Sequence, residues 1–291
     1  MSVLEFSFSP VSNNYPKLML KLPDHPKQLY TSGSPQSLQM TLLAVVGTRK
    51  MTSYGKFVVR ELIPQLVAAG FGIVSGLAFG VDAEAHQATI DCCGKTIAVL
   101  PGGLDMITPP SHTGLAQCIV ESGGCLLSEH PAGTPTMKHQ YILRNRIIAG
   151  MSQATLVIEA GEKSGALITA HWAAEYGRPV FAIPGPINNP YSEGTKKLIN
   201  EGATLVTSVE DILEEFSMLF PKSIVPKEIR AFQSVDQEHI YHAIALAQTG
   251  LAFEELQRDT GLPISVIQAE ITLLEMQSAI QKIGSRFFVK T

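Results

Sequence analysis

Three short segments of the sequence combine positive charge with glycine in a way that suits phosphate binding. The first is GTRK at residues 47–50, directly after an apolar run, and the second is KSG at residues 163–165, directly before a helical pattern. At such strand-to-helix turns the first helical amides have no acceptor in the helix, and the helix dipole adds positive potential. The third segment, RNR at residues 144–146, adds two guanidinium groups to a predicted helix. The chemistry that these segments predict is the binding of phosphate groups.

Lys138 and Tyr141 come six and three residues before Arg144. In a helix, Tyr141 and Arg144 lie on one face and Lys138 lies near the helix start. A cation beside an aromatic ring suits single-stranded nucleic acid, because the ring stacks on a base of any identity. Packing in the hydrophobic core is the other interpretation of Tyr141, and the sequence leaves both open.

The two arginines of RNR point to different faces of a helix, so one phosphate does not contact both. We assign Arg144 to the phosphate site and expect an internal role for Arg146, such as binding carbonyl groups or Glu159. Ser75 and Gly76 end another apolar run and offer further backbone donors.

Apolar runs typical of buried strands alternate with helical patterns between residues 42 and 220. The predicted strands lie near residues 42–46, 71–74, 96–100, 125–127, 155–158, 180–183 and 204–206. Continuous apolar runs are typical of strands buried on both faces, and the alternation predicts a parallel sheet with helices on both sides. The predicted fold class is therefore α/β, a Rossmann-like, doubly wound and mostly parallel sheet. Because the carboxyl ends of parallel strands meet at one edge, we expect the phosphate-binding segments to line a single groove.

We divide the chain into four parts. Residues 1–40, rich in Pro, Ser and Asn, are predicted as an irregular N-terminal arm packed on the core, residues 41–220 as the Rossmann-like DNA-binding domain, and residues 221–235 as a linker. Residues 236–291 are predicted as a small C-terminal winged-helix domain, because three helical patterns precede a hairpin pattern. The predicted recognition helix, residues 264–275, has two glutamates and neither Lys nor Arg, so we expect it to contact protein rather than duplex DNA.

Composition restricts the classes of function. The 291 residues are 45% hydrophobic and 16% charged, which predicts a globular chain, and no apolar run approaches the ~18 residues of a membrane span. The N-terminus has an acidic residue where a signal peptide is basic, so we expect a cytoplasmic protein with no membrane segment. The four cysteines lack metal-site spacing, which predicts buried thiols and no metal. Because the net charge is −4, a nucleic-acid site must be a local groove, which suits a narrow single-strand track.

The order of several motifs resembles the DNA processing protein A (DprA/Smf) family. These motifs include VVGTRKMTSYG (45–55), VSGLAFGVDAEAH (74–86), TIAVLPGGLD (96–105), LLSEHPAGT (126–134), RNRIIAG (144–150), KSGALITA (163–170) and GRPVFAIPG (177–185). The resemblance implies a protein, not an enzyme, that binds single-stranded DNA, protects incoming DNA and loads RecA recombinase in natural transformation and recombination. It also implies a homodimer, Arg49 as the principal phosphate contact, and DNA contacts from Lys138 and the ring of Tyr141.

The candidate DNA-binding residues are therefore Gly47, Thr48, Arg49, Ser75, Gly76, Lys138, Tyr141, Arg144, Arg146, Lys163, Ser164 and Gly165. For RecA, an exposed apolar patch within residues 212–220 is one candidate surface. Core packing is an equal interpretation of these residues.

The alternative function is a nucleotide-hydrolysing Rossmann-like enzyme. SGLAFG followed by PGG is similar to the phosphoribohydrolases, which need Gly-Thr and then a glutamate shortly after PGG. Here Leu104 and Asp105 follow PGG, so the catalytic carboxylate is missing. We therefore predict no catalytic residue and no cofactor.

Overall fold

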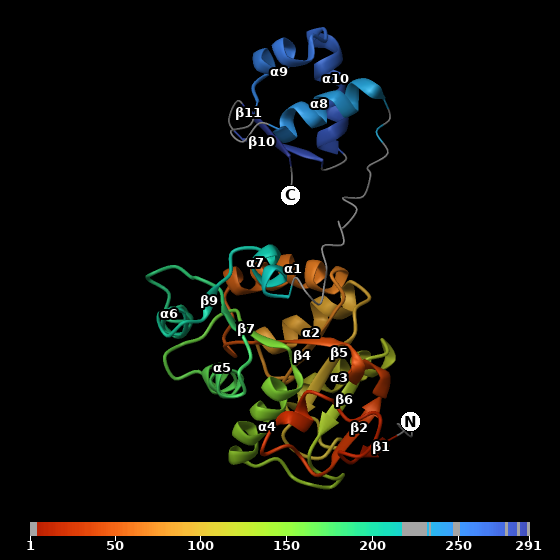
Figure 1. Cartoon of the computed structure of the whole chain (residues 1–291), viewed down its shortest axis with the longest axis vertical. Helices are drawn as coiled ribbons and strands as arrows, with labels where there is room; N and C mark the ends of the chain where they lie inside the picture. Colours follow the sequence, from red (N-terminus) through yellow and green to blue (C-terminus); the bar gives the residue numbers. More distant parts are fainter. Residues whose placement is uncertain are drawn as a thin grey trace. The chain divides into compact units, whose positions relative to one another are not determined.

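The computed structural model describes residues 5–216, 232, 234–246, 251–276, 279–283 and 286–289. Contacts divide the chain into a larger unit, Met1–Pro221, and a smaller unit, Lys222–Thr291 (Figure 1). Apart from residues 232, 234 and 235, the predicted linker at 221–235 lies outside the described residues. Within the described part of the chain, no helix has the length and apolar content to cross a membrane.

The larger unit is built on a nine-stranded sheet whose spatial order is β1-β2-β6-β5-β4-β3-β7-β8-β9. All pairings from β6 to β9 are parallel, whereas β1–β2 and β2–β6 are antiparallel. This mostly parallel sheet confirms the predicted fold class, and its seven parallel strands match the predicted runs. The strands are β1 (Glu5–Phe8), β2 (Leu29–Gly33), β3 (Thr41–Val46), β4 (Phe71–Ser75), β5 (Thr96–Leu100), β6 (Cys125–Ser128), β7 (Ala154–Val157), β8 (Val180–Ala182) and β9 (Thr204–Leu205).

Helices cover both faces of this sheet, as Figure 1 shows. Leu43 and Val45 of β3 pack with α1, α2 and α7, whereas Leu42, Ala44 and Val46 pack on the other face with α4 and α5. This alternation explains why the strand is apolar at every position from Leu42 to Val46. The helices are α1 (Ser53–Ala68), α2 (Val81–Asp91), α3 (Thr113–Glu121), α4 (Lys138–Met151), α5 (Gly165–Glu175), α6 (Glu193–Asn200) and α7 (Val209–Glu215), with 3₁₀ helices at Met19–Lys21, Pro35–Gln39 and Pro110–His112.

The strand order reverses direction at β3. The chain runs from β3 outward through β4, β5 and β6, and then returns to place β7 on the other side of β3. The loops that leave β3 and β7 therefore diverge to opposite faces of the sheet and leave a crevice at its carboxyl edge, where open α/β sheets bind ligands.

The irregular arm predicted over residues 1–40 is wrong in one respect, because this segment adds β1 and β2 to the sheet. β2 pairs antiparallel with β6 and satisfies backbone groups that β6 would otherwise leave unpaired. The prediction missed β1 although Glu5–Phe8 alternates polar and apolar residues, and it missed β2 because Leu29–Gly33 has no such alternation. The segment is also held by Tyr15, whose hydroxyl donates to the Pro26 carbonyl at 2.6 Å; burial raises the pKa of this phenol to about 12.

The smaller unit contains the three predicted helices and the predicted hairpin. They are α8 (Val235–Leu246), α9 (Phe253–Thr260), α10 (Ile264–Met276), β10 (Ile280–Ile283) and β11 (Arg286–Val289). The two strands pair antiparallel, and a separate hydrophobic core joins the helices to β11 through Phe287. This is the arrangement of a winged helix.

Candidate nucleic-acid interface

A pocket of about 390 Å³ opens at the crevice between β3 and β7. It is built by the β3–α1 loop, the β7–α5 loop and the exposed face of α4. The predicted residues that line it are Gly47, Thr48, Arg49, Tyr141, Arg144, Lys163, Ser164 and Gly165. The topology therefore brings together segments more than a hundred residues apart in sequence, as expected for a single groove.

A larger pocket of about 830 Å³ lies along α5 and α6 and shares Lys163 and Ser164 with the first. Its wall includes three glutamates, Glu162, Glu201 and Glu215. We place the anion site in the smaller pocket, because only this pocket lies at the topological switch point.

Arg49 and Tyr141 form the outer wall of the smaller pocket. Arg49 is exposed, and its guanidinium carbon lies 5.4 Å from the centre of the Tyr141 ring, which is a cation–π contact between the β3–α1 loop and α4. The Tyr141 ring is half-buried and faces the pocket, so the core-packing interpretation of this residue does not hold. The pair presents one fixed positive charge beside one aromatic surface.

The second wall is the turn that starts α5. Ser164 is the N-cap, and its hydroxyl accepts a hydrogen bond from the Ala166 amide at 3.3 Å. Gly165, the first helical residue, is exposed, and a side chain there would have no heavy atom of the described protein within 4 Å. The ammonium-bearing Lys163 is exposed on the same turn. Helical amides and a lysine therefore face the same space, which suits an anion.

Gly47 and Thr48 serve the pocket through their backbone packing. A Cβ on Gly47 would come within 2.5 Å of Val81, so this position has room only for glycine. The Thr48 amide donates to the Glu159 carbonyl at 2.7 Å, and its own carbonyl accepts from Val81 at 3.2 Å. The Thr48 backbone therefore fixes the loop, and its amide is already bonded.

Ser75, Gly76 and Arg144 form a buried layer beneath the pocket. The Arg144 guanidinium donates to the carbonyls of Gly76, at 2.7 Å, and Val99, while the Gly76 amide donates to Asp82 at 3.1 Å. The Ser75 hydroxyl donates to the Val45 carbonyl. The expectation of free backbone donors at Ser75 and Gly76 is wrong, because strand pairing and Asp82 already occupy them. Arg144 lines the pocket floor, but with 6% exposure its charge is directed inward.

Burial shifts the protonation equilibria in this layer. It lowers the pKa of Arg144 to about 10, an effect that the Asp82 carboxylate opposes. It raises the pKa of Asp82, with Arg144 and the two amides as the opposing causes. It lowers the pKa of His86 to about 3, and the positive charge of Arg144 adds to this shift. Arg144 therefore stays charged at neutral pH, and His86 stays neutral.

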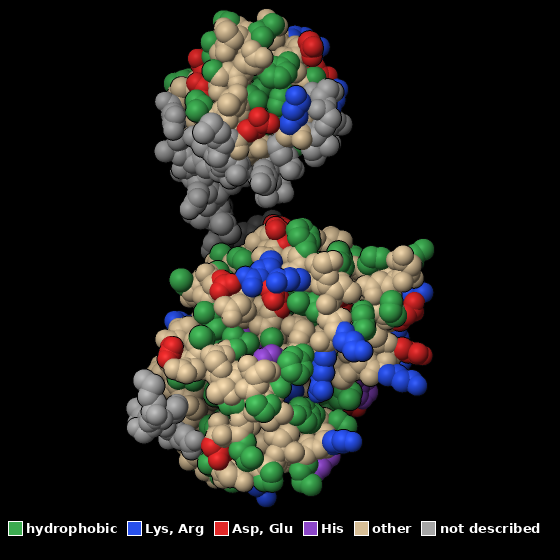
Figure 2. All heavy atoms as spheres, turned by 180° about the vertical axis from the view of Figure 1, so that it is seen from behind, with side chains coloured by type: hydrophobic (Ala, Val, Ile, Leu, Met, Phe, Trp, Pro, Cys, Tyr) green, Lys and Arg blue, Asp and Glu red, His purple; other side chains and the backbone are tan. Residues whose placement is uncertain are grey.

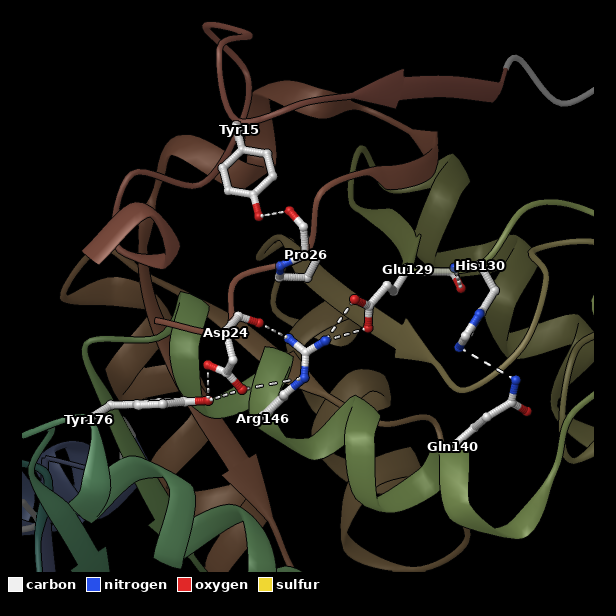
Figure 3. Close-up of polar contacts among 9 residues, drawn as sticks. Tyr15, Asp24, Pro26, Glu129, His130, Gln140, Arg146 and Tyr176 are labelled. Carbon is white, nitrogen blue, oxygen red and sulfur yellow. Dashed lines mark hydrogen bonds and ion pairs between the residues drawn. The ribbon is translucent and has the colours of Figure 1, made fainter. Parts of the chain in front are cut away.

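Arg146 lies away from the pocket and anchors the N-terminal segment (Figure 3). Its guanidinium donates to both carboxylate oxygens of Glu129, at 2.7 and 2.6 Å, and to the Asp24 carbonyl at 2.8 Å. The Tyr176 hydroxyl donates to the Asp24 carboxylate at 2.9 Å. The predicted internal role and carbonyl contact are present, but the acidic partners are Glu129 and Asp24 and not Glu159. The planar guanidinium joins α4, the β6 end and the N-terminal segment into one unit.

Glu159 has a different role from the one proposed at the sequence level. Its carboxylate accepts from the Thr52 amide and hydroxyl, at 2.9 and 2.6 Å, and from Asn189 at 3.2 Å. Thr52 in turn caps α1 by accepting from the Gly55 amide. Glu159 therefore fixes the β3–α1 loop that presents Arg49.

Lys138 is exposed at the first position of α4, outside the pocket lining. It lies one helical turn before Tyr141, so its charge extends the positive potential along the helix. On the face of the larger unit that Figure 2 presents, Lys and Arg side chains are scattered among apolar and uncharged surface and do not gather in one large basic patch.

Tyr191 and Asn145 line the pocket but were not predicted from the sequence. Tyr191 follows β8 in a loop in which its carbonyl accepts from the Ala160 amide at 2.7 Å. Asn145 donates to the Gly165 carbonyl at 3.2 Å and so ties α4 to the start of α5. Their positions in the sequence could have indicated both residues as part of the site, because Tyr191 lies in the loop that follows a predicted strand and Asn145 lies between the two arginines.

The surroundings of Asp105, of residues 212–216 and of Glu270 bear on three further expectations from the sequence. The Asp105 carboxylate accepts two contacts from the Gly133 amide, at 2.8 and 3.0 Å, and so fastens a loop. Ile212 and Phe216 are buried in the core of the larger unit, so the core-packing interpretation holds for these two residues, and residues 217–220 lie outside the described residues. On α10, the predicted recognition helix, the Glu270 carboxylate accepts a hydrogen bond from the Ser234 hydroxyl at 2.7 Å.

The fold and the pocket define a class: a Rossmann-like protein with an anion-binding and aromatic crevice at its topological switch point, followed by a winged helix. The family model for "DNA recombination-mediator protein A" matches residues 7–217. The chain belongs to this family of DNA-processing proteins.

Named relatives and solved structures agree. The chain is 41% identical over 260 residues to Protein Smf of Escherichia coli, and the match covers 88% of this chain and 67% of that protein. It is 43% identical to the DNA processing protein DprA of Bacillus subtilis, and that match covers 70% of this chain and 69% of the relative. The crystal structure of DprA from Streptococcus pneumoniae superposes with a TM-score of 0.69 at 42% identity, covering 72% of this chain and 74% of the other. The structure of DprA from Helicobacter pylori was described with its single-stranded DNA binding mode. It superposes with a TM-score of 0.67 at 29% identity, covering 75% of this chain and 98% of the other.

Proposed function

We propose that this chain is a cytoplasmic, non-enzymatic single-stranded DNA-binding protein that protects incoming DNA and loads RecA recombinase onto it. The observation that carries the proposal is the pocket at the switch point, where Arg49 lies over Tyr141 and Lys163 lies on the opposite wall. Single-stranded DNA alternates a charged phosphate with an aromatic base, and this pocket alternates cations with aromatic rings. The single-stranded DNA described for the Helicobacter pylori relative supports the same ligand.

In the proposed complex, successive phosphates contact Arg49, Lys163 and Lys138, and the Gly165 end of α5 offers amides to one of them. A base stacks on Tyr141. Arg144 and Arg146 hold the framework through the carbonyls and carboxylates described above. Because no contact in this scheme reads a base edge, binding is expected to be independent of sequence.

Tyr141 provides the sharpest test of stacking. The Tyr141→Ala variant should bind a fluorescent oligo-dT at least about fivefold more weakly, since base–aromatic stacking contributes ~1–3 kcal/mol per base. Tyr141→Phe should bind as the wild type does, because the ring is retained. Equal weakening by both variants would show that the hydroxyl matters and would contradict stacking, and unchanged binding by Tyr141→Ala would remove the ring from the site.

Loading of RecA and homodimer formation are further parts of the proposal, supported by family membership. The loading test measures RecA filament formation on an oligonucleotide coated with single-strand-binding protein, where this chain should shorten the lag. Sedimentation should give twice the monomer mass.

We propose that the winged helix contacts protein, because its α10 carries Glu270 and Glu275 and, among its described residues, neither Lys nor Arg. Tight duplex binding by the chain that is lost when α10 is altered would contradict this.

A further inference from the structure

Phe79 is an aromatic side chain on the surface of the carboxyl edge. It lies in the loop between β4 and α2, and 49% of it is exposed. Its ring packs edge to face against His112, with 4.8 Å between the ring centres. One side of the ring is therefore supported by protein and the rest faces solvent, a geometry that suits a stacking partner.

The backbone holds this ring firmly in place. Leu77 is fully buried although its φ is +57°, and Gly80 has φ +75°. Positive φ at a leucine is uncommon and marks a loop whose conformation is fixed by its surroundings. The His112 ring nitrogen Nδ1 lies 2.8 Å from the Leu77 carbonyl and joins the support to the loop.

The Phe79 loop abuts the Arg49 loop. A Cβ on Gly80 would lie 2.3 Å from the Thr48 carbonyl oxygen and 2.8 Å from the Arg49 carbonyl carbon, so the two backbones are in direct contact. Ala78 lines the pocket that contains Arg49 and Tyr141. Phe79 is the next residue and is exposed on the same β4–α2 loop, beside the pocket lining.

We propose that Phe79 is a second base-stacking platform, which extends the single-strand track from Tyr141 past Arg49 to the β4–α2 loop. The inference rests on the proposed function and adds a residue that is neither among the candidate DNA-binding residues nor in the pocket lining. A nucleotide base is favoured as the occupant because the loop that carries the ring contacts the Arg49 loop and, through Ala78, lines the pocket that pairs a cation with an aromatic ring. Its effect should be independent of salt, since Phe79 neutralises no phosphate.

The test combines protein variants with abasic oligonucleotides. The shortest oligo-dT that binds with full affinity is first defined, so that the protein cannot shift to another register. Each base in turn is then removed, and the affinity of the full chain is measured for the wild type, Phe79→Ala, Phe79→Tyr and Tyr141→Ala. Phe57→Ala is the matched control, because Phe57 is 64% exposed on α1 and does not line the pocket.

The expected result is two abasic positions that weaken binding to the wild type. Phe79→Ala should weaken binding to the intact oligonucleotide about fivefold or more, leave the salt slope unchanged and abolish the effect at one of the two positions. Phe79→Tyr and Phe57→Ala should behave as the wild type. If Phe79→Ala weakens binding no more than Phe57→Ala while Tyr141→Ala still does so, the second platform is overturned and the proposed function stands. If the wild type does not bind the oligonucleotide, both fall.

Discussion

His86, beneath the candidate pocket, should make the stability of the larger unit sensitive to acid. It is fully buried, and its Nδ1 lies 2.7 Å from the Thr96 hydroxyl, which itself donates to the Ile73 carbonyl at 2.8 Å. Nδ1 therefore donates to Thr96, and the unprotonated nitrogen is Nε2. Within the described residues Nε2 has no hydrogen-bond partner. A proton there would be buried without an acceptor and near Arg144.

The size of the effect follows from the pKa. Burial, reinforced by Arg144, lowers the pKa of His86 from 6.5 to about 3. Between these two values the unfolded chain binds a proton that the folded chain does not, so the free energy of unfolding decreases as the pH falls below 6.5. At ~1.36 kcal/mol per pH unit, lowering the pH from 7.5 to 4.5 should remove about 2.7 kcal/mol. This is a large part of the ~5–15 kcal/mol that stabilises a typical domain.

The assay is urea unfolding at pH 7.5 and 4.5, followed by the fluorescence of Trp172. This is the one tryptophan of the chain, and because it lies in α5 it reports on the larger unit alone. The comparison is with His86→Asn, whose amide retains a donor to Thr96 but does not titrate. Other groups titrate in both proteins, so the difference between their pH dependences isolates His86. The wild type should lose about 2.7 kcal/mol more than the variant. Equal losses in the two proteins would refute the reasoning.

Three further substitutions test the framework around the pocket. Arg146→Ala should lower the free energy of unfolding by about 1–3 kcal/mol, because it leaves the half-buried Glu129 without its partner. The folded variant should keep the DNA affinity of the wild type in a binding titration. Weaker binding at wild-type stability would place Arg146 in the interface instead. In urea unfolding, Gly76→Ala should lower the free energy of unfolding by about 1–3 kcal/mol, because its Cβ would meet the Arg144 guanidinium at 2.5 Å. Gly165→Ala, whose Cβ would meet open space, should change the free energy of unfolding by no more than ~0.5 kcal/mol. Equal effects of the two variants would contradict the packing described here.

The sheet could be predicted because its central strands are nearly continuous apolar runs. β3, β4 and β5 are covered on both faces, so their composition alone distinguishes them from loops. The same reasoning could not find β1 and β2, because both are short strands with polar positions whose stability comes from pairing, in the case of β2 with a strand far away in sequence. β2 forms only because β6 needs a partner, and nothing within residues 29–33 indicates that pairing.

The site was predictable at the level of loops and less so at the level of side chains. The glycine-flanked turns at 47–50 and 163–165 lie at the switch point, as expected from their position after strands. The inward direction of Arg144 was not predictable, because it depends on carbonyls that β4 and β5 bring beneath α4. Helical periodicity separates two faces but does not tell which face a neighbouring strand will cover.

The measurement that tests the central claim most directly is the salt dependence of single-strand binding. Fluorescence anisotropy of a labelled oligo-dT is recorded across a salt series, with duplex competitor, for the wild type and for Arg49→Ala/Lys163→Ala. Lys196→Ala, which removes an exposed lysine of α6 outside both pockets, is the control. The account predicts a wild type that prefers single strands and a double variant that binds more weakly, with a log-affinity versus log-salt slope shallower by about 1.4, or ~0.7 for each lost phosphate contact. Binding by the double variant with the affinity and slope of the wild type, or equal competition by duplex, would contradict it.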